Sequence, residues 1–120
     1  MAPVRVTSLL LIFLVTLSVA PVAADVRSEA KKQVEFGIAV AQRGLWREAI
    51  YRWERAAQID PTYGAPHNNL GIAYEHEGEL DKARAAYEKA IALEPHNAFI
   101  KQNYELFKEI NDRTTRQDTQ

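Results

Sequence analysis

The sequence contains an internal repeat with an offset of 34 residues. Residues 30–63 can be laid over residues 64–97 without a gap, so that small residues fall on small ones and Trp53 falls on Tyr87. The identical pairs are Gly37 with Gly71, Ile38 with Ile72, Ala39 with Ala73, Gly44 with Gly78, Ala49 with Ala83, Glu54 with Glu88, Ala56 with Ala90 and Pro61 with Pro95. Repetition at this period is typical of stacked repeat arrays, so we expect two copies of one small unit.

Each unit is predicted to contain two helices. In the first unit, apolar and small residues follow a spacing of three and four over residues 28–42 and again over 46–58. Gly44 lies between them, where glycine can end a helix in the left-handed conformation, and Pro61 ends the second helix. The second unit repeats this plan over residues 65–77 and 80–93, around Gly78. The predicted fold is all-α, an α-solenoid of two helix–turn–helix repeats.

A fifth helix is predicted over about residues 96–111, after the second unit. Its apolar residues continue the phase of the repeat, but no second helix follows it, so it is expected to cap the stack. Residues 113–120 are polar and lack periodicity, which predicts a disordered tail. The repeat domain is therefore expected to occupy residues 28–112.

The first 24 residues form a separate segment. Arg5 is the only charged residue before Asp25, residues 9–15 are all apolar, and Val22, Ala23 and Ala24 supply small residues before a possible cut. This order is typical of a secretory signal peptide, and it predicts an exported protein, periplasmic or secreted. An uncleaved membrane anchor over about residues 6–24 is the alternative.

Composition excludes several classes of function. The formal net charge is −1, which gives no basic surface for nucleic acid. The chain has no cysteine, so disulfides, thiolate nucleophiles and zinc–thiolate sites are excluded. The 120 residues suffice for one modest domain.

The acidic run over residues 75–81, which contains His76, is the strongest candidate for chemistry. No second histidine follows four residues later, so the zinc-protease helix motif is absent. Glu79 or Asp81 is expected to cap the following helix, where acidic side chains favour the helix dipole. We therefore predict no catalytic residue, no cofactor and no metal. A small metal-binding protein or hydrolase that uses His76 and the neighbouring acids is the alternative.

The second unit resembles the tetratricopeptide repeat (TPR) in Leu70-Gly71-x-x-Tyr74, Gly78, Ala83, Tyr87, Ala90 and Pro95. The first unit matches more loosely, through Phe36-Gly37-x-x-Val40, Gly44, Ala49, Trp53, Ala56 and Pro61. The resemblance implies a small exported TPR protein without catalysis, a protein–protein interaction module or assembly adaptor. It also implies a concave groove, lined by the first helix of each unit, that holds an extended peptide or a partner helix.

The same resemblance assigns the residues of that groove. They are Lys31, Val34, Ile38, Gln42, Ala65, Asn68, Asn69, Ile72, Glu75, His76, Phe99 and Asn103, with Leu106 following on the last helix. The apolar members favour an apolar or amphipathic segment as the ligand. Of the positions that form a carboxylate clamp in one subgroup of the family, only Asn69 fits, so binding of a chaperone tail is not expected.

Two units are fewer than the three that repeat arrays commonly need. This shortage predicts either self-association as a homo-oligomer or a partner that covers the first unit. The expected surfaces are Tyr51, Trp53 and the face of residues 34–41. Alternatively, the last helix closes the stack sufficiently.

Overall fold

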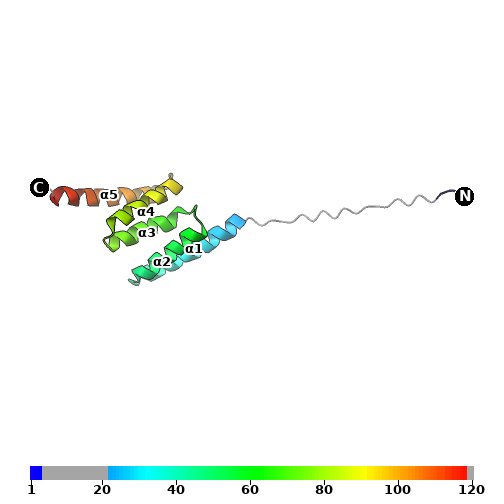
Figure 1. The fold of residues 1–120 in the computed structure, drawn as a ribbon, viewed down its shortest axis with the longest axis horizontal. Coiled ribbons are helices and arrows are strands. Elements are labelled where there is room, and N and C mark those ends of the chain that lie inside the picture. Colours follow the sequence, from blue (N-terminus) through cyan, green and yellow to red (C-terminus); the bar gives the residue numbers. More distant parts are fainter. Residues whose placement is uncertain (4–21, 119–120) are drawn as a thin grey trace.

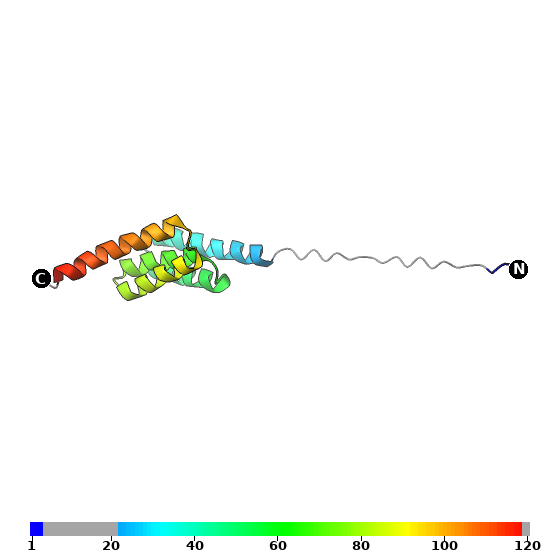
Figure 2. The ribbon, with the colours of Figure 1, turned by 90° about the horizontal axis from the view of Figure 1, so that it is seen from above.

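The computed structural model describes residues 1–3 and 22–118, and five helices form in this part of the chain (Figure 1). They are α1 (Val22–Ala41), α2 (Trp46–Ile59), α3 (Gly64–His76), α4 (Leu80–Leu93) and α5 (Ala98–Asp118). Helices α1 and α2 form one antiparallel pair, α3 and α4 form the next, and α5 follows α4 at the far end of the stack (Figures 1 and 2). The predicted all-α solenoid is confirmed.

The start of α1 differs from the prediction. The helix begins at Val22 rather than near Ser28, so the predicted cut after Ala24 falls within its first turn. The apolar block over residues 9–15 lies outside the described residues. Within the described part, no helix is long and apolar enough to cross a membrane.

The turns inside the two helix pairs have the same construction. Gly44 has a φ of 78° and Gly78 a φ of 74°, the left-handed conformation expected of both. Leu45 N donates to Val40 O at 3.0 Å, and Glu79 N donates to Tyr74 O at 2.8 Å. These are equivalent bonds in the two units, and they satisfy carbonyls that the helix end would leave unpaired. The sequence repeat is therefore also a repeat of hydrogen bonds.

Small residues in the first helix of each unit make room for an aromatic ring from the second. A Cβ added at Gly71 would lie 2.8 Å from the ring of Tyr87, and one added at Gly37 would lie 2.8 Å from Trp53 Cδ1. At both glycines the absent side chain leaves space that the ring of the second helix fills. Replacement of either glycine would force the aromatic side chain to shift.

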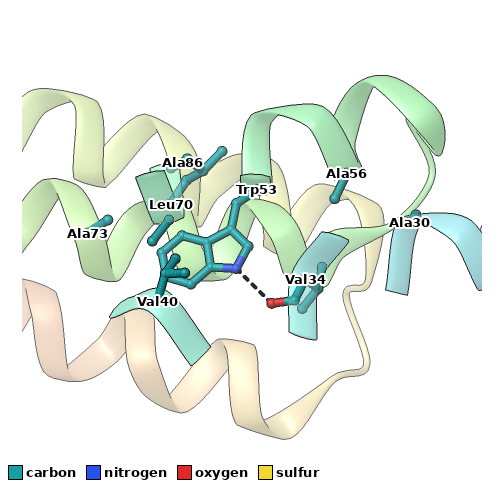
Figure 3. Packing of buried hydrophobic residues seen from close by; sticks show 9 residues of the cluster. Ala30, Val34, Val40, Trp53, Ala56, Leu70, Ala73 and Ala86 are labelled. Carbon is teal, nitrogen blue, oxygen red and sulfur yellow. Dashed lines mark hydrogen bonds between the residues drawn. The ribbon is translucent and has the colours of Figure 1, made fainter. Parts of the chain in front are cut away.

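Trp53 is the centre of the larger core cluster. It is only 3% exposed, and its Nε1 donates to Val34 O at 3.1 Å (Figure 3). Its neighbours in the cluster include Val40 of its own unit and Leu70 of the next, so one ring joins the two units. The prediction that Trp53 offers a surface for self-association is therefore wrong. Tyr51 is 55% exposed, and self-association there stays a prediction.

Helix α5 starts later and ends later than predicted. Asn97 Oδ1 accepts hydrogen bonds from Phe99 N at 3.1 Å and Ile100 N at 3.3 Å, so Asn97 caps the helix. Residues 113–118, predicted as a disordered tail, continue the helix instead. Arg113 pairs with Glu109 one turn earlier, which favours continuation of the helix over a polar stretch.

Helix α5 closes the stack with a polar outer face. Gln102 and Glu105 occupy the repeat positions of Asn68 and Gly71, which are buried in the second unit. On α5 both side chains are exposed, so the face on which a following helix would pack carries an amide and a carboxylate. The opposite side is apolar, since Ile100 and Phe107 are 2% and 1% exposed. A terminal helix with one polar face is the usual cap of a repeat array.

A buried carboxylate ties the start of α1 to the turn between the two units. Asp60 is 6% exposed, and its Oδ2 accepts from Arg27 Nε at 2.5 Å. Its Oδ1 accepts from Thr62 N at 3.0 Å and from the Thr62 hydroxyl at 2.7 Å. The hydrogen bonds from Arg27 and Thr62 hold the pKa of Asp60 below its usual value, although burial opposes them. The Arg27 guanidinium also lies 4.3 Å from the centre of the Tyr63 ring.

Asp60→Asn is expected to lower the free energy of unfolding at pH 7 by about 1–2 kcal/mol, since Arg27 is partly solvated. Because the pKa of Asp60 is lowered on folding, its contribution is complete above about pH 4 and is lost as the pH falls through the folded-state pKa. Urea unfolding of both proteins between pH 7 and pH 2.5 measures this. The stability difference should shrink toward acid, whereas the control Asp81→Asn, at an exposed site, should cost only a few tenths of a kcal/mol. A difference that does not change with pH would contradict the role of Asp60.

Candidate partner-binding groove

The first helices of successive units present a row of exposed apolar side chains. Ile38 on α1, Ile72 on α3 and Leu106 on α5 occupy the same repeat position, and they are 41%, 37% and 55% exposed. Each of these helices also places a different stripe in the core, as Val34, Leu70 and Phe107 show. A continuous apolar row across successive elements is typical of an interaction site.

Two hollows lie on either side of Ile72. The first, of about 280 Å³, lies between the two helix pairs and is lined by Ile38, Ala41, Gln42, Trp46, Trp53, Asn69 and Ile72. The second, of about 140 Å³, lies between α3 and α5 and is lined by Ile72, Glu75, Tyr87, Asn103, Leu106, Phe107 and Ile110. Because both contain Ile72, they form one interrupted groove, which we call the Ile72 groove.

The second hollow contains a hydrogen-bonded acid. The Tyr87 hydroxyl donates to Glu75 Oε2 at 2.5 Å, and Tyr87 itself is 1% exposed. Burial, together with the Glu75 carboxylate, raises the pKa of the Tyr87 hydroxyl well above its usual value. Tyr87 therefore stays protonated and fixes the direction of the Glu75 side chain across the hollow.

A network of side-chain amides connects α3 and α5 beside the groove. Asn103 Nδ2 on α5 donates to Asn68 Oδ1 on α3 at 3.0 Å, and Asn68 Nδ2 lies 3.4 Å from Asn69 Oδ1. Asn68 is 2% exposed, so this bond replaces contact with water. The network therefore links the two helices that form the second hollow.

Half of the twelve predicted groove residues line the hollows: Ile38, Gln42, Asn69, Ile72, Glu75 and Asn103. Val34 and Asn68 are 6% and 2% exposed, so assigning them to the groove surface was wrong. Val34 packs in the core beside Trp53, and Asn68 turns toward α5. Lys31, Ala65, His76 and Phe99 line neither hollow.

The sequence interpretation did not include two residues of the groove wall, the half-buried Trp46 and the exposed Ile110. Trp46 begins α2, outside the first helices on which the prediction relied. Its ring stacks on His76, with the ring centres 4.2 Å apart, so His76 supports the wall of the first hollow. Ile110 could have been found, because it occupies the repeat position of Gln42 and His76.

The acidic run over residues 75–81 gives no support to the metal-binding alternative. Within the described residues, no group of three or more histidine, cysteine or acidic side chains could hold a metal ion. Glu79 stands at the start of α4, but its side chain makes no capping hydrogen bond, so that predicted cap is wrong. Its carboxylate pairs with Lys82 instead. Asp81 lies in the first turn, where its charge favours the helix dipole.

Comparison with known proteins agrees with this geometry. A family model described as "TPR repeat" matches residues 37–78, and one described as "Tetratricopeptide repeat" matches residues 65–97. Together they span 37–97, half of the chain.

Several longer proteins are similar to part of this chain. Type IV pilus assembly protein PilF of Pseudomonas aeruginosa is 32% identical over 65% of this chain and 31% of its own length. Small glutamine-rich tetratricopeptide repeat-containing protein 2 of Mycosarcoma maydis is 32% identical over 59% of this chain and 20% of its own length. Protein O-mannosyl-transferase TMTC4 of Mus musculus is 31% identical over 53% of this chain and 9% of its own length. The chain thus spans less than a third of each relative.

Proposed function

Since this chain belongs to the tetratricopeptide repeat family and is a protein-interaction module, we propose that it is an assembly adaptor whose Ile72 groove holds an apolar or amphipathic segment of a partner protein. Repeats of this family are generally non-catalytic. The enzyme name of one relative belongs to a protein of which this chain matches only 9%.

The observation that carries the proposal is the exposed row of Ile38, Ile72 and Leu106, with a hollow on each side of Ile72. These three side chains lie outside the core, in which Trp53 and Phe107 are buried. Exposed apolar surface in a concave site is stabilised when a partner's apolar side chains displace the water that covers it. Hydrophobic contact is therefore the main source of affinity.

Ile72→Glu is expected to abolish partner binding while leaving the fold intact, because the side chain is more than a third exposed and belongs to both hollows. A carboxylate there would be left unpaired under an apolar ligand, which costs at least tenfold in affinity. The measurement is affinity capture from the native host, with the full chain carrying a C-terminal tag. A titration with the captured partner follows.

Leu45→Glu is the matched control for this experiment. Leu45 is 48% exposed and lines neither hollow, and its repeat equivalent is the natural Glu79. This variant should capture the same partner as the wild type. If Ile72→Glu also retained it with unchanged affinity, the groove would not be the binding site.

We also propose that the protein works outside the cytoplasm, on the support of the signal-like pattern in residues 1–24. A cleaved leader would release the adaptor into the periplasm or the medium, and a retained one would tether it to the membrane. N-terminal sequencing of the protein from its native host distinguishes these outcomes: a start at Asp25 is expected. Recovery of the intact chain from the cytoplasm would contradict export.

A further inference from the structure

The spacing of the two hollows favours one secondary structure for the partner segment that fills both. This inference rests on the proposed function. The first hollow lies between the α1/α2 pair and α3, and the second between α3 and α5, so they are one helix spacing apart. Packed helices are about 8–10 Å apart. An α-helix presents residues i and i+7 on one face about 10 Å apart, at a rise of about 1.5 Å per residue. An extended strand repeats its face about every 7 Å and matches this spacing less closely.

The first hollow suits a large apolar side chain. Its wall consists mainly of aliphatic and indole carbon from Ile38, Trp46 and Ile72, and the Trp46 indole is held in place by the stack on His76. About 280 Å³ is room for one leucine, phenylalanine or methionine, with the neighbouring turn of a helix closing the opening.

The second hollow suits a long side chain that ends in a cation. Its stem would contact Leu106 and Ile110, and its end would reach the carboxylate of Glu75. No lysine, arginine or histidine among the described residues pairs with Glu75. Lys82 pairs with Glu79 and Lys108 with Glu105, and the Arg84 guanidinium lies 5.3 Å from the centre of the Phe107 ring. Among the described residues, Glu75 is therefore an acid on the wall of this hollow without a paired cation.

We infer that the partner segment is an amphipathic α-helix with a large apolar residue in the first hollow and a lysine or arginine seven residues away, in either chain direction, paired with Glu75 in the second. The Tyr87 hydroxyl leaves the second carboxylate oxygen of Glu75 for this contact. The apolar residue supplies affinity, and the cation supplies register and orientation, because only one placement of the helix satisfies both hollows.

The test is a selection from a displayed library of 21-residue helices randomised along one face, on the purified full chain. The best helix is then titrated together with its version in which glutamine replaces the cation. On the wild type this replacement is expected to weaken binding about tenfold. On Glu75→Gln, which keeps an oxygen for the Tyr87 hydroxyl, the loss should be less than twofold. Glu77→Gln, which lies outside the hollow, serves as the control and should behave as the wild type.

Each outcome bears on the inference. Enrichment of a cation seven residues from a large apolar residue, with the Glu75-dependent loss, supports it. Helices that bind without such a cation, or lose the same affinity on wild type and Glu75→Gln, overturn it while leaving the proposed function in place, provided that Ile72→Glu abolishes their binding. If the library yields no binder that depends on Ile72, the inference and the proposed function both fail.

Discussion

Trp53→Ala is expected to lower the free energy of unfolding by about 3–5 kcal/mol, a large share of the stability of a domain of this size. The ring is 3% exposed, lies directly against Gly37 and packs against Leu70 of the next unit. Its loss would leave a cavity between the two units and remove the hydrogen bond to Val34 O. Urea unfolding followed by circular dichroism measures the change.

Tyr51→Ala is the control for this substitution, on the same helix and also from an aromatic residue. Tyr51 is 55% exposed, so the loss should be within about 1 kcal/mol. Similar costs for Trp53→Ala and Tyr51→Ala would show that the ring of Trp53 does not hold the units together. The unfolding transition of Trp53→Ala should also be less cooperative than that of the wild type, because the ring connects neighbouring units.

Ala83→Leu is expected to destabilise the second unit by about 2–3 kcal/mol through overpacking. Ala83 is completely buried and shares a cluster with Tyr87 and Phe107, so the added carbons would displace the Tyr87 ring or push α4 from α3. The melting temperature should fall by several degrees. Displacement of Tyr87 would also disturb its hydrogen bond to Glu75 in the groove.

Ala85→Leu tests whether the effect comes from burial rather than from leucine itself. Ala85 is exposed on the same helix, and leucine is nearly as good a helix former as alanine. Its melting temperature should stay close to that of the wild type. Unchanged melting of Ala83→Leu as well would mean that the packing of α4 on α3 differs from that described.

The fold could be predicted from the sequence because the repeat specifies several levels of structure together. Gly44 and Gly78 mark both turns, Gly37 and Gly71 mark where an aromatic ring approaches a backbone, and the prolines end the second helices. The predicted start and end of α4 agree with the structure. The end of α5 was harder to predict, because its last turns are polar and lack a periodic pattern of apolar residues. Ion pairs between neighbouring turns support the helix there instead.

The groove was predictable only in part. The sequence shows which residues share a stripe of a helix, but a residue at the edge of a stripe can face either the core or the groove. Val34 borders both the core stripe and the groove stripe, and contact with Trp53 decides in favour of the core. Because Asn68 is polar, the sequence places it on the surface. In the structure it is buried and accepts a hydrogen bond from Asn103 on α5. Trp46 lines the first hollow from α2, the second helix of its unit. The prediction assigned the groove to the first helices and therefore did not include it.

The polar outer face of α5 also limits the affinity with which one copy of this protein can bind a partner helix. Gln102 and Glu105 disfavour the packing of a further helix there, and the groove formed by the described residues is three helices wide. At about 8–10 Å per helix, it can contact about 16–20 residues of a crossing helix. Such a short contact favours rapid exchange of partners, and tight assembly then requires several copies of the adaptor or several sites on the partner acting together through avidity.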